Sequence, residues 1–113
     1  MIIDQVRELV GVGKITEANE LLGYKYQTKG RLIRAQIQGL SIVIPTDSME
    51  AIPCGGNYIG LVEIAGQENL TKIVVNESQE QTSSAVIFVD LRDFNELPHV
   101  SSLPVSIRWI EQE

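Results

Sequence analysis

The sequence predicts a mainly β fold: a six-stranded antiparallel barrel of Greek-key type with a short helical lead-in at the N-terminus. Three observations predict it. Residues 1–23 contain two short runs with helical periodicity, and from residue 24 onward β-branched and aromatic residues alternate with polar ones. Six such runs follow one another with short connections, and 113 residues suffice for one domain with its own core. We therefore expect residues 1–23 to pack on a barrel formed by residues 24–113.

The lead-in is expected to form two amphipathic helices. Residues 2–10 place their apolar side chains, among them Val6 and Val10, on one helical face. In the second helix, residues 16–22, Thr16 is the expected N-cap and Gly23 ends the helix. Both helices are too short to be stable alone, so they must pack on the rest of the chain.

The expected strands are residues 24–39, 42–44, 57–64, 72–75, 85–91 and 105–110. Gly30, inside the first strand, indicates a bulge or a sharp bend. Pro45 ends the second strand because proline has no N–H to give to a neighbouring strand. Residues 66–69 are expected to form a hairpin turn, and the very apolar run 85–91 is expected at the centre of the sheet.

Composition excludes several classes of protein. Hydrophobic residues make up 43% of the chain and charged residues 21%, which excludes a disordered tail and a coiled coil. The net charge of −6 argues against a general nucleic-acid binder, which needs clustered Lys and Arg. Cys54 is the only cysteine, and no apolar run approaches the ~20 residues of a membrane span. The sequence therefore predicts a soluble cytoplasmic protein that binds neither nucleic acid nor membrane.

The stretch most typical of a functional site is residues 39–58. An apolar strand ends at Pro45, and a hydroxyl, a carboxylate and a second hydroxyl follow at residues 46–48. These groups could hold a phosphate or a metal ion, or they could simply cap the turn. The pair Gly55-Gly56 then lets the backbone bend or approach another group closely. An ordinary surface loop has the same composition, so both readings stay open.

Four segments follow one another in the order and spacing of a known family. The first segment, residues 18–32, has Ala, Leu-Leu-Gly, Tyr and Gly at the places where the family has them. The second, residues 39–48, contains Pro-Thr, and the third, residues 53–58, contains Pro, Gly and Tyr. The fourth is the apolar run 85–91. In these segments the chain resembles the riboflavin kinase domain, the C-terminal half of bacterial bifunctional riboflavin kinase/FMN adenylyltransferases. The resemblance covers nearly all of the chain and implies the same barrel fold.

The resemblance also implies ligands and site residues. The ligands would be riboflavin or FMN together with Mg-ADP or Mg-ATP. The residues implied to bind them are Thr46, Asp47, Ser48, Gly55, Gly56 and Tyr58. Thr46 and Asp47 are implied as ligands of the metal ion that accompanies the nucleotide.

The chain departs from the family at the reacting centre. Where the family has a glutamate that prepares the riboflavin hydroxyl for attack, this chain has Ala85, which cannot accept a proton. Ser48 replaces a metal-binding asparagine, and Val43 replaces the glycine before Pro-Thr. The sequence ends at Glu113 without the helix that closes over the flavin in the family. We therefore expect no catalytic residue and a catalytically silent relative.

Three functions remain open from the sequence. The first is a binding or regulatory module. It would use the mouth of the barrel for a ligand, or it would bind a protein partner through the lead-in helix. The second is a minimal riboflavin kinase in which Glu50, Asp47 or Glu63 replaces the lost base. The third is a structural subunit of a larger assembly.

The isolated aromatic, thiol and imidazole side chains are first expected to be structural. Trp109 is expected in the barrel wall, with ligand stacking as the alternative. Tyr24 and Tyr26 are expected to pack the helices onto the barrel, although either ring could stack on a flat ligand. His99 and Cys54 lack the neighbours of a metal ligand or a nucleophile.

Overall fold

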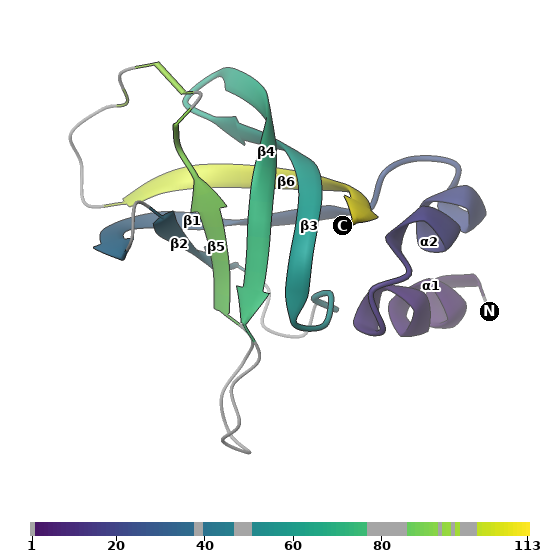
Figure 1. Ribbon diagram of the computed structural model, residues 1–113. Coiled ribbons are helices and arrows are strands. Elements are labelled where there is room, and N and C mark those ends of the chain that lie inside the picture. Colours follow the sequence, from purple (N-terminus) through teal and green to yellow (C-terminus); the bar gives the residue numbers. More distant parts are fainter. Residues whose placement is uncertain are drawn as a thin grey trace.

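The computed structural model is a ring of strands with two short helices beside one end (Figure 1). It describes residues 2–37, 40–46, 51–76, 86–92, 94, 95, 97 and 102–113. The expected mainly β fold with a closed six-stranded antiparallel barrel and an N-terminal helical lead-in is confirmed. Within the described residues, no helix is long and apolar enough to span a membrane.

The lead-in forms α1 (Ile2–Gly11) and α2 (Ile15–Leu22), close to the expected bounds. The N-cap of α2 is Lys14, which makes no capping hydrogen bond, so the expectation that Thr16 caps this helix is wrong. The helix starts earlier because Ile15 is itself a buried apolar position of α2. Gly23 ends α2 as expected, in the left-handed conformation (φ 79°) that glycine adopts without a steric cost.

The barrel strands are β1 (Gln27–Ile37), β2 (Leu40–Pro45), β3 (Gly56–Ile64), β4 (Gln67–Asn76), β5 (Val86–Asp90) and β6 (Ser102–Gln112). They follow the order β1-β2-β5-β4-β3-β6, and each neighbouring pair is antiparallel. β3, β4 and β5 are consecutive neighbours, and β2 returns to lie beside β5, which is the Greek-key arrangement. β6 pairs with both β1 and β3 and so closes the ring.

The predicted central strand has no special place in this ring. β5 lies between β2 and β4, as every strand of a closed barrel lies between two others. Its side chains alternate between buried ones, Ile87 and Val89, and half-buried ones on the outside. A run that is apolar throughout is therefore half inward and half outward here, and a closed ring has no central strand that would set β5 apart. Ala85 lies outside the described residues.

The β3–β4 turn is tighter than expected. Ile64 pairs with Gln67, so only Ala65 and Gly66 form the loop, and both have positive φ (52° and 81°). Two residues with positive φ match the twist of the flanking strands, as in a type I′ turn. The observed turn, Ala65-Gly66, begins one residue before the expected turn at 66–69. Residues 67–69 of the expected turn belong to β4 and pair with β3.

Gly30 is required by a close approach of two backbones. It pairs in regular register with Pro45, and the irregularity of the β1–β2 pair lies between Ile33 and Ile37 instead. A Cβ atom on Gly30 would collide with the carbonyl oxygen of Ile44 and lie 3.1 Å from the Cα of Pro45. The expected bulge at Gly30 is wrong, and tight contact between strands explains the glycine.

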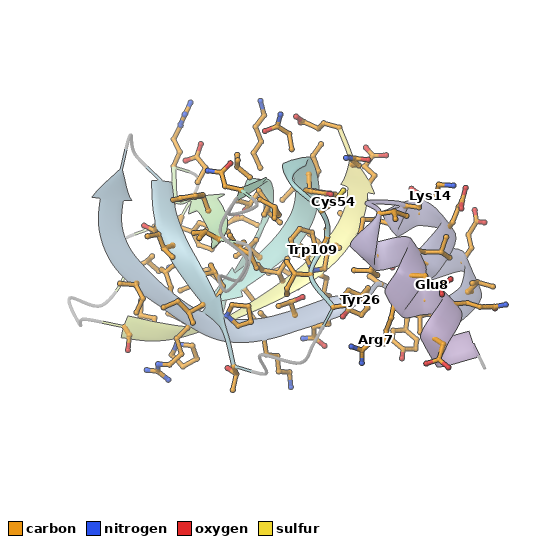
Figure 2. All side chains as sticks on the ribbon, turned by 90° about the horizontal axis from the view of Figure 1, so that it is seen from below. Arg7, Glu8, Lys14, Tyr26, Cys54 and Trp109 are labelled. Atoms are coloured by element: carbon orange, nitrogen blue, oxygen red, sulfur yellow. The ribbon has the colours of Figure 1, made fainter. Side chains whose placement is uncertain are left out.

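The core fills the barrel and continues under the helices. It contains the inward side chains of the strands together with Val6, Val10, Ile15 and Ala18 of the helices. Trp109 is fully buried inside the barrel, as Figure 2 shows. Its ring meets that of Tyr58 edge to face at 5.5 Å, and its Nε1 donates to Thr28 Oγ1 at 2.8 Å. The prediction that Trp109 packs in the barrel is confirmed, and a fully buried ring offers no face to a ligand.

Asn19 of α2 links the helices to the barrel through two hydrogen bonds. Its Oδ1 accepts a hydrogen bond from the Tyr26 N–H at 2.7 Å, and its Nδ2 donates to the Trp109 carbonyl at 2.8 Å. Tyr26 lies at the junction between the helices and the barrel (Figure 2), and its hydroxyl donates to the Ala51 carbonyl at 2.7 Å. Tyr26 therefore has the packing role expected for it. Tyr24 does not, because it is 67% exposed.

Candidate functional site

The predicted ligand-binding residues fall at two separate places. Thr46 lies at the end of β2, whereas Gly55, Gly56 and Tyr58 lie at the start of β3. The remaining predicted residues, Asp47 and Ser48, lie outside the described residues, as does the alternative base Glu50.

Thr46 lies in a surface groove of about 580 Å³, which we call the Thr46 groove. The Thr46 N–H donates to the Lys29 carbonyl at 3.0 Å, so the residue continues the β2 edge onto β1. The groove brings Thr46 together with Lys29 and Arg31 of β1, Ser106 of β6 and Glu63 of β3. The alternative base Glu63 and the predicted ligand Thr46 therefore share one depression.

Strand register explains this grouping. Lys29 pairs with Ser106, and Ser106 pairs with Glu63 on the other side of β6. Side chains at paired positions lie on the same face of a sheet, so all three point outward. Arg31 is held in place because its Nε and Nη2 atoms donate to Ser102 Oγ at 3.1 and 3.0 Å. The groove thus offers two cations, two hydroxyls and one exposed carboxylate.

The start of β3 forms the second place. Tyr58 is fully buried, and its hydroxyl donates to the carbonyl of Cys54. Gly13 of the α1–α2 turn packs here, since a Cβ on it would lie 3.0 Å from the Tyr58 hydroxyl. A Cβ on Gly56 would lie 3.1 Å from Nε2 of Gln112. These residues join the helices, the loop before β3 and the end of β6.

Among the described residues, those that line the Thr46 groove do not include Gly55, Gly56 or Tyr58. Gly56 and Glu63 are seven residues apart on one strand, so we estimate roughly 20 Å between them at about 3.3 Å per residue. Gly55 is exposed and Tyr58 is a core residue. The buried position of Tyr58 disfavours its predicted contact with a ligand, and the roles of Thr46, Gly55 and Gly56 remain predictions.

Val43 fills the barrel interior. It is 2% exposed and lies between Leu32 of β1 and Ile87 of β5, both fully buried. At this position, where the resemblance places a glycine, a branched side chain now packs in the core. The structure therefore gives Val43 a clear packing role.

The described residues contain no group of three His, Cys, Asp or Glu side chains close enough to hold a metal ion. The predicted metal ligands are Thr46 and Asp47. Because Asp47 is not described, this pair remains a prediction.

Sequence reasoning missed the basic side chains of the groove. Lys29 and Arg31 are two residues apart on a strand, so alternation alone places both on one face. That signal was available in the sequence. Their position in one groove with Ser106 and Glu63 depends on pairing across β6, which no local pattern reveals.

Two comparisons with known proteins bear on this site and fold. In an alignment of 113 positions that covers 94% of this chain, the sequence is 28% identical to the bifunctional riboflavin kinase/FMN adenylyltransferase of Listeria monocytogenes. This similarity, together with the six-stranded barrel, supports a riboflavin kinase-like domain. The chain spans only 35% of that bifunctional enzyme, so the activities of the whole enzyme do not transfer with the resemblance.

A solved structure has the same fold as this chain. It is the crystal structure of a macrolide-efflux protein from Streptococcus pneumoniae, with a TM-score of 0.84 and 21% sequence identity. The match covers 97% of this chain and 38% of that protein. No known protein-family model matches the sequence.

Proposed function

We propose that this riboflavin kinase-like domain is catalytically silent and acts as a ligand-binding or protein-interaction module. One observation carries the proposal: Ala85 stands where the resemblance requires the carboxylate that takes the proton of the riboflavin hydroxyl. Phosphoryl transfer relies on positioning and charge stabilisation, yet losing the base lowers the rate by orders of magnitude. The core position of Val43 supports the same reading, because a branched side chain is buried where the resemblance places a glycine.

The proposed small-molecule ligand is a flavin, riboflavin or FMN, with or without Mg-ADP or Mg-ATP. The similarity to an enzyme named for riboflavin and FMN supports this ligand class. The proposed contacts are Thr46, Asp47 and Ser48 after β2 and the Gly55-Gly56 pair before β3. The two groups lie on either side of the connection between β2 and β3 in the sequence.

Flavin fluorescence tests the proposal, because a bound isoalloxazine ring changes its emission. Riboflavin and FMN are titrated with the domain, with and without ADP and Mg²⁺. We expect saturable quenching that a Thr46→Val variant weakens. Absence of quenching with every combination would contradict flavin binding and leave the protein-interaction role.

A minimal riboflavin kinase is the second candidate, favoured by one observation: Glu63 and Thr46 share a groove. In this reaction the Glu63 carboxylate would take the riboflavin hydroxyl proton, the oxygen would attack the γ-phosphorus of ATP, and ADP would leave. The test is FMN formation by the wild type and by Glu63→Gln. Turnover that Glu63→Gln abolishes supports the kinase, and turnover that it leaves unchanged excludes Glu63 as the base.

The protein-interaction role would use the helical lead-in. Large apolar side chains are exposed there: Val12 is 60%, Leu21 44% and Tyr24 67% exposed. These side chains support docking of a protein partner on α1 and α2. A cytoplasmic location and the absence of nucleic-acid binding are further parts of this proposal.

A further inference from the structure

One outer face of the barrel is strongly basic although the chain is acidic. The outward side chains of β1 and the segment before it are Lys25, Gln27, Lys29 and Arg31, and those of β6 beside them are Pro104, Ser106 and Arg108. Four of these seven positions are cationic and none is acidic, in a chain with 9 basic and 15 acidic residues. The exposed carboxylate of Glu63 on β3 borders this surface beside Ser106. We call this surface the β1–β6 basic face.

Most of its charge is uncompensated in the part of the chain that the structure describes. Lys25 and Lys29 form no ion pair with any described residue. Arg31 binds only the neutral hydroxyl of Ser102 and keeps its full charge. Arg108 is partly neutralised by Glu68 at 3.5 Å, so Lys25, Lys29 and Arg31 carry the positive potential.

These cations have no packing role within the fold. The inward side of β1 and β6 holds the core, with Thr28, Leu32 and Trp109 fully buried. The cations lie on the opposite side and line two neighbouring depressions, one of about 390 Å³ beside Lys25 and the Thr46 groove of about 580 Å³ beside Lys29 and Arg31. A row of like charges held on one rigid sheet repels itself, and an anionic partner relieves this repulsion.

We propose that the β1–β6 basic face binds an extended acidic peptide segment of a protein partner. The row from Lys25 to Arg31 spans six residues, about 20 Å at 3.3 Å per residue, which is longer than one mononucleotide. Lys29 and Arg31 are about 6.6 Å apart, the spacing of alternate side chains in an extended peptide. Acidic residues at alternate positions therefore face successive cations of the row. Lys29 and Arg31 also line the Thr46 groove, so this contact adjoins the proposed flavin contact at Thr46, but it needs no bound flavin.

A single-stranded nucleic acid fits this face less well. Sequence-tolerant binding of single strands needs aromatic side chains on which bases stack. Trp109 of β6 is buried, and the exposed ring of Tyr24 beside Lys25 lies at one end of the face, where it can stack on a single base rather than on a row of bases. The net charge of −6 also repels a polyanion as dense as DNA, whereas a peptide carries fewer charges per unit length.

The test uses the full chain and a fluorescein-labelled peptide of four Glu-Ser repeats, with binding followed by anisotropy at low ionic strength. We expect Lys29→Glu/Arg31→Glu to weaken binding by about tenfold or more, because each exposed pair contributes little alone but two attractions become repulsions. Raising the salt concentration should weaken the wild-type complex, because the charges are exposed.

A matched control has the same change in net charge elsewhere. Lys14→Glu/Lys72→Glu alters two exposed lysines, the N-cap residue of α2 and one on β4, and we expect less than about a twofold effect because those sites are screened from the peptide. An equal loss in both double variants would overturn the proposal, since only net charge would then matter. Tighter binding of an oligothymidylate of equal charge, or no peptide binding at low salt, would also overturn it.

Discussion

The junction between the helices and the barrel depends on Asn19, so Asn19→Ala is the sharpest test of how the chain is assembled. The substitution removes two hydrogen bonds, 2.7 Å to the Tyr26 N–H and 2.8 Å to the Trp109 carbonyl. It also leaves both backbone groups half-buried without this partner. Each net hydrogen bond contributes about 1 kcal/mol and an unsatisfied buried group costs more, so we expect a loss of about 2 to 3 kcal/mol.

Urea unfolding measures this loss directly. Trp109 is the only tryptophan of the chain and its carbonyl is one of the two partners, so its fluorescence reports unfolding at the junction. A loss of about 2 kcal/mol corresponds to a fall of roughly 8 °C in the melting temperature of a domain of this size. Far-ultraviolet circular dichroism should follow the same transition if helices and barrel unfold together.

Two variants of α2 provide the comparison. Glu20→Ala changes an exposed neighbour and should alter the free energy of unfolding by less than about 0.5 kcal/mol. Asn19→Asp keeps the acceptor for the Tyr26 N–H but places a carboxylate oxygen against the Trp109 carbonyl, so it should destabilise at least as much as alanine. The reasoning is refuted if Asn19→Ala is as stable as Glu20→Ala.

Three further predictions concern the barrel and its chemistry. Gly30→Ala should lower the stability by about 2 kcal/mol through overpacking between strands, whereas Gly11→Ala, with nothing within 4 Å of its new Cβ, should not destabilise; thermal melting compares them. Thr28→Val should cost about 1 to 3 kcal/mol because the buried Trp109 N–H loses its acceptor, and Thr28→Ser should cost less because the hydroxyl stays; equal urea midpoints for the two would argue against this hydrogen bond. Ala85→Glu alone should not create riboflavin kinase activity, because Val43 still fills the core; strong FMN formation by this variant would show that one missing carboxylate explains the silence.

Sequence patterns revealed the elements of this fold well. Apolar residues at helical spacing marked both helices, and Gly23 marked the end of α2 because only glycine is comfortable at its positive φ. Alternation marked the strands. The order of strands in the ring was less accessible, since it depends on pairings between residues far apart in the sequence, such as Thr28 with Ile107.

The candidate site was less predictable than the fold. Tyr58 was predicted to contact a ligand. It lies on the same face of β3 as the buried Val62 and Ile64, so alternation along the strand alone indicates a core position. The meeting of Thr46 with Glu63 could not be predicted, because it depends on the register of strands that lie between them. Local patterns identify faces of strands, and register decides which faces meet.

Formation of FMN from riboflavin and Mg-ATP, followed by separation of the two flavins, tests the central claim most directly. The assay uses this chain at high concentration beside a riboflavin kinase that carries the glutamate at the position of Ala85. The account predicts FMN from the control enzyme and none above background from this chain. Steady turnover by this chain that scales with its concentration would contradict a catalytically silent domain.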